Sequence, residues 1–271
     1  MNKKFCVVLS LTLALLSTNV PAGQTMKGDS GKCMDNFSFL FDYSGSFNKV
    51  PIEEKKAEED QPRQRSQEKK GLMTEEEFFK TKKILSVKKF LTELPKRIPI
   101  QDFNCGVFSF APYTEVLKYG HYSEEDFKKG IEEIKGNLEV MGRRTPLGIA
   151  IEEHGVLLAE NGLKGSVYLI TDGQINRGRR VVTPTEEEKE KEKFDKEEEE
   201  IPALVKFKER NPEVCLIVLS YADTEEDRKM VDRMVAEIPC SRKIELKDLL
   251  ISDQKLDAFI AESFSKDCNR K

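Results

Sequence analysis

Short apolar runs alternate with longer stretches of helical periodicity along most of this chain. The short runs are rich in β-branched and aromatic residues, which is typical of buried strands. They predict strands at Asn36–Phe41, Phe103–Phe110, Glu115–Tyr119, Ser166–Thr171, Val214–Ser220 and Lys243–Leu246. The longer stretches predict helices at Glu75–Leu94, Glu124–Gly136, Pro146–Glu160, Lys196–Glu209, Glu225–Glu237 and Asp253–Phe264. Because strands alternate with helices, we predict a doubly wound α/β fold in which helices cover both faces of a mainly parallel, six-stranded sheet.

The first residues have the pattern of a secretory signal peptide. A basic start at Lys3 and Lys4 precedes an apolar run from Phe5 to Ser17, and small residues follow up to Ala22. We expect cleavage after Ala22. The apolar run is too short to cross a bilayer as a helix, and no later segment is long enough, so we expect no transmembrane segment in the mature chain. The protein is therefore expected to be periplasmic or secreted.

Two stretches, residues 51–70 and 183–200, are highly charged and nearly free of apolar side chains. Segments of this composition bury too little surface to order themselves, so we interpret both as solvated insertions. The alternative for the second stretch is a binding arm for a basic partner. We predict one domain over residues 36–268 that contains both insertions, after a signal peptide at 1–22 and an extension at 23–35.

The composition argues against several classes of protein. The formal net charge is −4, so no basic field attracts the phosphates of a nucleic acid. No CxxC, P-loop or GxSxG string is present. The chain has 2 histidines, His121 and His154, and neither lies in an acid–base motif. His154 is expected to be packed or half exposed on its helix. We therefore do not expect an enzyme, and a metal-dependent hydrolase is the alternative.

Side chains with hard oxygen atoms follow two of the predicted strands. Asp42, Ser44 and Ser46 come directly after the first strand, and Asp172 follows the strand that ends at Thr171. Carboxyl ends of parallel strands share one edge of a sheet, which is the natural ligand site of such folds. Thr145, at the start of a predicted helix, adds a further hydroxyl. We expect these residues on the rim of the sheet.

Two carboxylates and three hydroxyls, without sulfur or imidazole, suit Mg²⁺ or a similar divalent ion such as Mn²⁺ or Ca²⁺. The simpler interpretation is a set of turn caps, which Asp and Ser form routinely. Turn caps account for Asp42 and Ser44, but they do not account for Thr145 and Asp172. The sequence therefore predicts a metal site.

The same residues resemble a known family. Asp42-Tyr43-Ser44-Gly45-Ser46, Thr145-Pro146-Leu147 and Thr171-Asp172-Gly173 are similar to the three motifs of the von Willebrand factor type A domain and its metal-ion-dependent adhesion site. They come in the family's order and at strand ends. Bacterial periplasmic type A proteins are similar in further segments, which are here Cys33–Phe37, Thr145–Gly148 and Val218–Asp223.

The resemblance implies roles for the matching positions. Ser44 and Ser46 would bind the ion directly, and Thr145 would do so directly or through water. Asp42 and Asp172 would act mainly through waters. An Asp or Glu carboxylate of a protein partner would fill the open position on the ion.

Tyr43, Arg143 and Arg144 are candidate partner-binding residues beside this site. The ordinary interpretation of the two arginines is surface solvation, and the functional one is a steering clamp for an acidic partner. The resemblance thus implies a metal-dependent, adhesion-type binding module of the bacterial cell envelope. Besides the hydrolase, the alternative is an envelope structural or assembly protein without a working metal site.

Of the 6 cysteines, Cys6 would leave with the signal peptide. Cys215 begins one predicted strand and Cys240 precedes the next, so both would lie near the amino-terminal edge of the sheet, and we expect them to form a disulfide. Type A domains tend to bring their ends together, which favours a second bridge, Cys33–Cys268. Cys105 would then remain a buried thiol. Spacing alone does not fix this connectivity.

Overall fold

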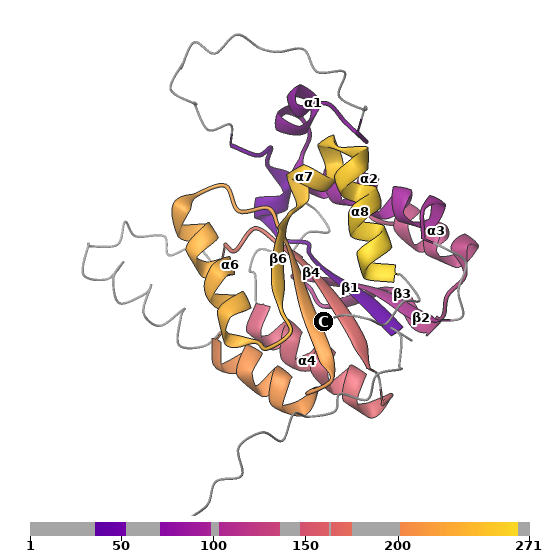
Figure 1. Ribbon diagram of the computed structural model, residues 1–271, viewed down its shortest axis with the longest axis vertical. Coiled ribbons are helices and arrows are strands. Elements are labelled where there is room, and N and C mark those ends of the chain that lie inside the picture. The colour runs from indigo at the N-terminus through magenta and orange to yellow at the C-terminus, as the bar shows by residue number, and fades with distance from the viewer. Residues whose placement is uncertain are drawn as a thin grey trace, which may run out of the picture. The chain divides into compact units, whose positions relative to one another are not determined.

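A six-stranded sheet forms the centre of the described domain (Figure 1). The computed structural model describes residues 36–52, 71–98, 103–135, 147–162, 164–174 and 201–264. Its strands are β1 (Asn36–Asp42), β2 (Asn104–Phe110), β3 (Thr114–His121), β4 (Gly165–Thr171), β5 (Val214–Ser220) and β6 (Arg242–Glu245). Their order is β3-β2-β1-β4-β5-β6, in which only β3 is antiparallel to its neighbour. The predicted mainly parallel sheet is confirmed.

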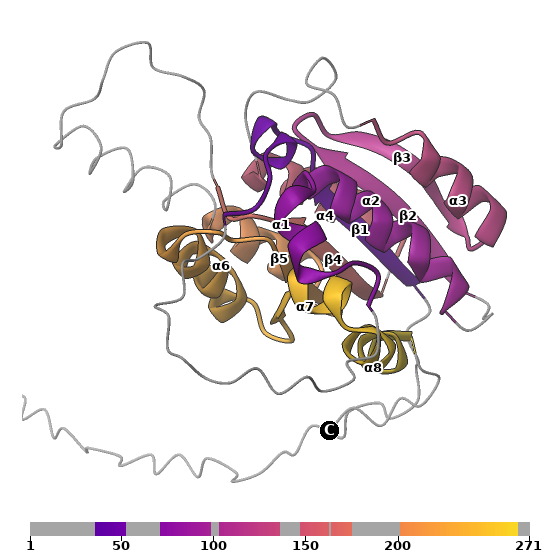
Figure 2. The same ribbon diagram turned by 90° about the horizontal axis from the view of Figure 1, so that it is seen from above.

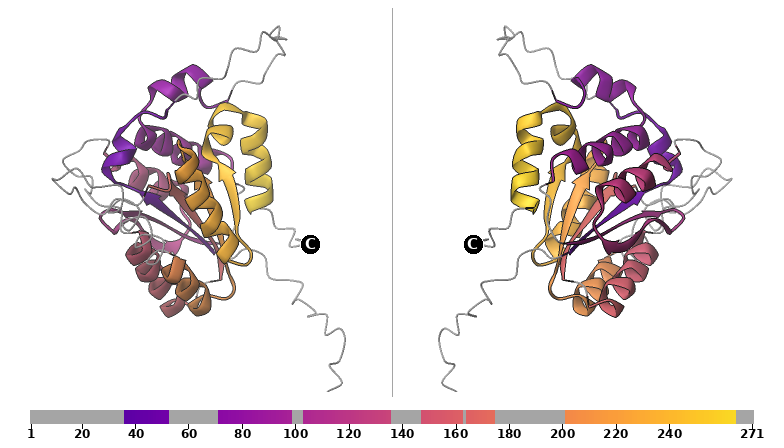
Figure 3. Two further views of the ribbon diagram at one scale, coloured as in Figure 1. Left: turned by 90° about the vertical axis from the view of Figure 1, so that its left-hand side faces the viewer. Right: turned by 90° about the vertical axis from the view of Figure 1, so that its right-hand side faces the viewer.

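Helices cover both faces of the sheet, as the turned views show (Figures 2 and 3). The helices on one face are α1 (Glu75–Lys80), α2 (Lys83–Glu93), α3 (Glu124–Glu132), α7 (Leu246–Ile251) and α8 (Asp253–Phe264). Those on the other face are α4 (Leu147–Glu160), the helical residues 201–210, and α6 (Glu225–Glu237). The predicted doubly wound α/β architecture is therefore confirmed. No helix in the described ranges has the length and hydropathy of a membrane span.

The central strands are apolar on both sides because both of their faces are covered. Along β1, Phe37, Phe39 and Phe41 pack toward α2, α3 and α8, whereas Leu40 packs toward α4. The ring of Phe39 stacks on Tyr168 of the neighbouring strand β4, with centroids 5.0 Å apart. The burial of β1 on both sides holds its carboxyl end, and the loop that follows, in a fixed position.

The helix expected over Glu75–Leu94 is in fact two helices, α1 and α2. Thr74 caps α1 in a capping box with Glu77, and the Thr81 hydroxyl donates a hydrogen bond to the Glu77 carbonyl at its end. Lys82 then takes an extended conformation, with φ −58° and ψ 140°. The periodicity continues through the break, so the pattern did not reveal it. A new helix axis therefore begins at Lys83.

Two smaller differences occur near the carboxyl terminus. The predicted strand Lys243–Leu246 ends at Glu245, because Leu246 is the first residue of the short helix α7, which was not predicted.

The insertion at 183–200, the leader at 1–22 and the extension at 23–35 lie outside the described residues, as does most of the insertion at 51–70.

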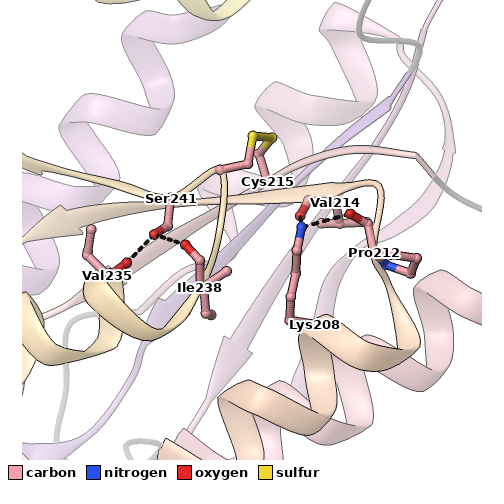
Figure 4. The surroundings of a disulfide bond; sticks show 8 residues. Lys208, Pro212, Val214, Cys215, Val235, Ile238 and Ser241 are labelled. Carbon is pink, nitrogen blue, oxygen red and sulfur yellow. Dashed lines mark hydrogen bonds between the residues drawn. A yellow bond between two sulfur atoms is a disulfide. The ribbon is translucent and has the colours of Figure 1, made fainter. Parts of the chain in front are cut away.

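A disulfide joins Cys215 at the start of β5 to Cys240 in the turn between α6 and β6, with Cα atoms 5.1 Å apart. Hydrogen bonds stabilise the same end of the sheet (Figure 4). The Ser241 hydroxyl donates to the Val235 and Ile238 carbonyls at the end of α6. The Lys208 ammonium donates to the Pro212 and Val214 carbonyls. The Cys215–Cys240 disulfide is the pair that the sequence favours. Cys33 and Cys268 lie outside the described residues.

Cys105 on β2 is a buried, free thiol in the structure. Burial raises the pKa of this thiol to about 12. It therefore stays protonated at neutral pH and behaves as a small apolar core residue, which is the role expected for it.

Loss of the disulfide should lower stability without affecting the metal site that the sequence predicts at the other end of the sheet. Because the bridge closes a loop with a sequence separation of 25, replacing Cys215 and Cys240 by serine should lower the free energy of unfolding by about 3.5 kcal/mol. Urea denaturation of the variant and the oxidised wild type measures this difference. Calorimetric titration of both should give the same affinity for divalent ions. A changed affinity would show that the two ends of the sheet are coupled.

Candidate metal centre

The carboxyl ends of three neighbouring strands bring three carboxylates to one edge of the sheet. Asp42 ends β1, Asp172 follows β4 and Asp223 follows β5. Strands β1, β4 and β5 are paired in parallel, so these ends lie side by side. Asp42 and Asp172 were predicted for this edge. Asp223 was not assigned to it, although the same rule of parallel strands would have found it.

The loop after β1 forms a compact oxygen cluster. Oδ1 of Asp42 accepts a hydrogen bond from the Ser44 amide at 2.7 Å, and the hydroxyls of Ser44 and Ser46 lie 2.8 Å apart. The chain turns through a short 3₁₀ helix, Gly45–Asn48, which holds Ser46 inward. Oδ2 of Asp42 is buried and has no hydrogen-bond partner in the structure. An unpaired buried carboxylate oxygen is costly, so this atom is suited to a cation or an ordered water.

The loop after β4 fixes the second carboxylate. Oδ1 of Asp172 accepts a hydrogen bond from the Gln174 amide at 3.1 Å. Gly173 between them has φ +74°, and a Cβ there would lie 2.6 Å from the Asp227 carbonyl oxygen. Only glycine fits this turn, as expected from its position behind the carboxylate.

Lys83, the first residue of α2, points into the same site and was not predicted. Its Nζ lies 3.1 Å from Oδ2 of Asp172 and 2.5 Å from Oδ2 of Asp223, and its side chain is 1% exposed. It also lies 5.9 Å from the ring centroids of Phe47 and Tyr221. The sequence held one signal for it: Lys83 shares a helical face with the buried Val87, Phe90, Leu91 and Leu94.

The predicted site residues lie inside the protein and not on an open rim. The exposed fractions are 0% for Asp42 and Asp172, 1% for Ser44 and 3% for Ser46. The expectation of a rim followed from their place at strand ends. It was wrong because Phe47, Tyr221 and the Lys83 side chain pack around this end of the sheet.

Burial shifts the pKa values of the charged groups in this site. Burial, followed by repulsion from Asp172, raises the pKa of Asp42 well above its usual value, although Ser44 and Lys83 oppose the rise. Burial also raises the pKa of Asp172, against the attraction of Lys83 and hydrogen bonds from the Gln174 amide and the Ser46 hydroxyl. Burial alone would lower the pKa of Lys83, but attraction and hydrogen bonds from Asp172 and Asp223 raise it. The two neighbouring carboxylates therefore favour additional positive charge.

The donor set fits a hard divalent ion. Formally, Asp42, Asp172 and Asp223 carry three negative charges against the one positive charge of Lys83, which leaves an excess of two. The unpaired Oδ2 of Asp42 and the Ser44–Ser46 hydroxyl pair supply oxygen ligands. Within the described chain, no three His, Cys, Asp or Glu side chains form a metal-binding group. An ion here would therefore depend on the serine hydroxyls.

The remaining predicted residues are placed as follows. The Tyr43 hydroxyl donates a hydrogen bond to the Lys135 carbonyl, so this group already has a partner within the chain. Thr145, Arg143 and Arg144 lie outside the described residues. The structure thus brings together Asp42, Ser44, Ser46 and Asp172 and leaves the other predicted positions untested.

Neither histidine takes part in this site. His154 on α4 is fully buried, with Nε2 2.8 Å from the Ser38 hydroxyl and Nδ1 3.1 Å from the Tyr113 hydroxyl. Burial lowers the pKa of His154 to about 3, so the ring is neutral. His121 ends β3 opposite Asn104, at the amino-terminal edge of the parallel strands. The packed position is one of the two expected for His154.

No protein-family model matches the sequence, and no curated protein matches it. Solved structures do resemble the fold. An aerotolerance-related membrane protein from Bacteroides fragilis has a TM-score of 0.50 at 14% identity, over 85% of this chain and 98% of that chain. BatB from Bacteroides thetaiotaomicron has a TM-score of 0.49 at 13% identity, over 85% of this chain and 97% of that chain. The ArnB paralog VWA2 from Sulfolobus acidocaldarius has a TM-score of 0.42 at 14% identity, over 87% of this chain and 46% of that chain.

At these identities the likeness concerns the fold alone. The features that define it here are the strand order β3-β2-β1-β4-β5-β6, the single antiparallel edge strand β3, and helices on both faces. The described part of this chain has a fold of the von Willebrand factor type A kind.

Proposed function

We propose that this protein is a binding module that holds a divalent ion, Mg²⁺ or alternatively Mn²⁺ or Ca²⁺, and recognises a carboxylate of a protein partner through it. The observation that supports this most directly is the buried, unpaired Oδ2 of Asp42 beside the hydroxyl pair of Ser44 and Ser46. When bound, the ion supplies an open coordination position for an outside oxygen.

The chain's own residues would divide the task. Ser44 and Ser46 would offer neutral hydroxyl oxygens to the ion, and Thr145 is proposed to add a third. The carboxylates of Asp42 and Asp172 would supply the compensating charge. The hydroxyl ligands are neutral and leave a coordination position open, so the ion can still bind a further carboxylate, and ion and partner should strengthen each other's binding by the same factor.

Binding is favoured over metal-dependent hydrolysis. A hydrolytic site needs a group near the ion that accepts and returns a proton at neutral pH. His154 is neutral and enclosed by Ser38 and Tyr113, and His121 lies at the opposite edge of the sheet. The buried lysine near Asp172 is held protonated by two carboxylates. In the described part of the chain, neither the histidines nor Lys83 is placed to carry a proton, which favours recognition over hydrolysis.

The proposed setting is the bacterial cell envelope, with the protein periplasmic or secreted. The Cys215–Cys240 disulfide supports an oxidising compartment, because such bonds are rare in reducing cytosol. The leader at residues 1–22, on which the expectation first rested, lies outside the described residues.

Calorimetric titration with Mg²⁺ and Mn²⁺ tests the ion. The wild type should bind one ion, and the Ser44→Ala/Ser46→Ala variant should bind it at least about tenfold more weakly, because two hard oxygen ligands are lost. Ser241→Ala, which alters a hydroxyl at the other end of the sheet, is the matched control. Equal affinity in all three proteins would refute this site.

Pull-down from an envelope extract tests the partner. The wild-type protein should retain its partner with Mg²⁺ present, release it with chelator, and regain it when Mg²⁺ returns. The serine variant should retain nothing above background. A partner that is retained equally with and without chelator would show that binding does not pass through an ion.

A further inference from the structure

We propose that Lys83 is a tethered cation that competes with the divalent ion at Asp172. This inference rests on the proposed ion site and assigns a regulatory residue to it. In the metal-free protein the lysine ammonium pairs with the carboxylates of Asp172 and Asp223, which would otherwise lack a positive partner there. An incoming ion must weaken that pairing, so Lys83 lowers the affinity of the site for metal.

The contacts of Lys83 show that it is built into the site. Its ammonium joins the loop after β4 to the loop after β5 through Asp172 and Asp223, at 3.1 and 2.5 Å. The backbone amide of Lys83 donates a hydrogen bond to the Lys49 carbonyl at 2.9 Å. The break between α1 and α2 sets the direction of this helix start. Lys83 is therefore fixed at both its backbone and its charged end.

The environment gives the ammonium few alternatives. The side chain is 1% exposed and lies beside the rings of Phe47 and Tyr221. Moving such a group into water would separate it from two carboxylates, so it should remain within the site when an ion arrives. Asp223 lets it do so, because this residue can keep the lysine after Asp172 turns toward the ion.

Charge alone then sets the sign of the effect. A divalent ion near Asp172 would share that carboxylate with the Lys83 ammonium. The ammonium would repel the ion, because like charges repel strongly where water is excluded. The same ammonium stabilises the metal-free protein, because it offsets Asp172 and Asp223. Lys83 thus favours the empty state of the site, and a partner's carboxylate favours the filled state.

The test compares Lys83→Met with Lys82→Met. Methionine keeps the length and apolar body of lysine without the charge. Lys82 is the matched control, since it is the preceding lysine and its Nζ bonds Asn48 at 2.9 Å, not the carboxylates. Titration with Mn²⁺ and Mg²⁺ should show Lys83→Met binding at least about tenfold more tightly than the wild type. Lys82→Met should stay within about twofold.

Thermal unfolding in chelator and in saturating Mn²⁺ gives a second readout. Lys83→Met should melt below the wild type in chelator and gain more from Mn²⁺ than the wild type does. A lysine with only a structural role would lower the melting temperature without changing the affinity for the ion. If Lys83→Met does not fold, Lys83→Met/Asp223→Asn removes the neighbouring charge as well and is compared with Asp223→Asn.

The outcomes separate this inference from the proposed function. Tight binding by Lys83→Met alone, with weak or no binding by the wild type, supports both. Equal affinities of wild type and Lys83→Met overturn the inference and leave the ion site standing. Equal tightening by Lys82→Met also overturns it, because the effect would then reflect net charge. Absence of ion binding by every variant overturns the ion site and the inference together.

Discussion

Replacing Asp42 by asparagine should greatly weaken ion binding while making the metal-free protein more stable. The affinity for Mn²⁺ should fall at least about a hundredfold, because a buried carboxylate next to the ion is lost. In chelator the free energy of unfolding should rise by about 1 kcal/mol, since asparagine removes a buried charge that Asp172 repels. Asparagine can still accept the hydrogen bond from the Ser44 amide. Calorimetry and urea denaturation measure the two quantities.

Asp257→Asn is the control, because this carboxylate is 65% exposed and pairs with Arg97 on the surface. It should change neither quantity measurably. Asp172→Ala is a less direct test than it seems from sequence, because it also deprives Lys83 of a partner and should destabilise the fold. An Asp42→Asn protein that binds Mn²⁺ like the wild type would remove Asp42 from the site.

Acidification should destabilise the protein through His154. The pKa of this ring is lowered from 6.5 to about 3 by burial, so the unfolded chain binds a proton that the folded protein excludes. The contribution is fully present above pH 6.5 and is lost as the pH falls toward 3. It should cost about 1.4 kcal/mol per pH unit in that window, or about 2 kcal/mol at pH 5.

Urea denaturation of the wild type and of His154→Gln between pH 7 and pH 4 measures this contribution. Asp42 and Asp172 act in the opposite direction, because their raised pKa values let the folded protein take up protons first. The difference between the two proteins cancels that effect. His154→Gln should lose less stability than the wild type on acidification. Parallel curves for the two proteins would mean that His154 is protonated without cost.

The strands and their shared edge could be predicted because both depend on local pattern. A strand buried on both faces appears as a continuous apolar run, and β5 was predicted with its observed bounds, Val214–Ser220. Parallel pairing then places the residues after each strand at one edge. Asp42 and Asp172 were found by this rule, although they are 130 positions apart. The rule says nothing of what packs above the edge.

Lys83 could not be placed in the same way, because its position depends on a helix break that periodicity does not register. Thr81 and Lys82 continue the helical pattern in sequence, yet the chain is extended at Lys82. A lysine on an apolar face was the available signal, and long side chains usually reach water from such positions. Only the tertiary arrangement of three strand ends shows that this one pairs with carboxylates inside the protein.

Strand β5 connects the disulfide at one end of the sheet to the proposed ion site at the other. Cys215, the second residue of the strand, forms the disulfide with Cys240. The residues after the strand lead to Asp223, whose ion pair with Lys83 would respond to divalent ions under the function proposed above. The strand itself, Val214–Ser220, has seven residues. A reductant and a chelator should therefore act on opposite ends of one rigid element, and their effects on local hydrogen exchange should be additive along it.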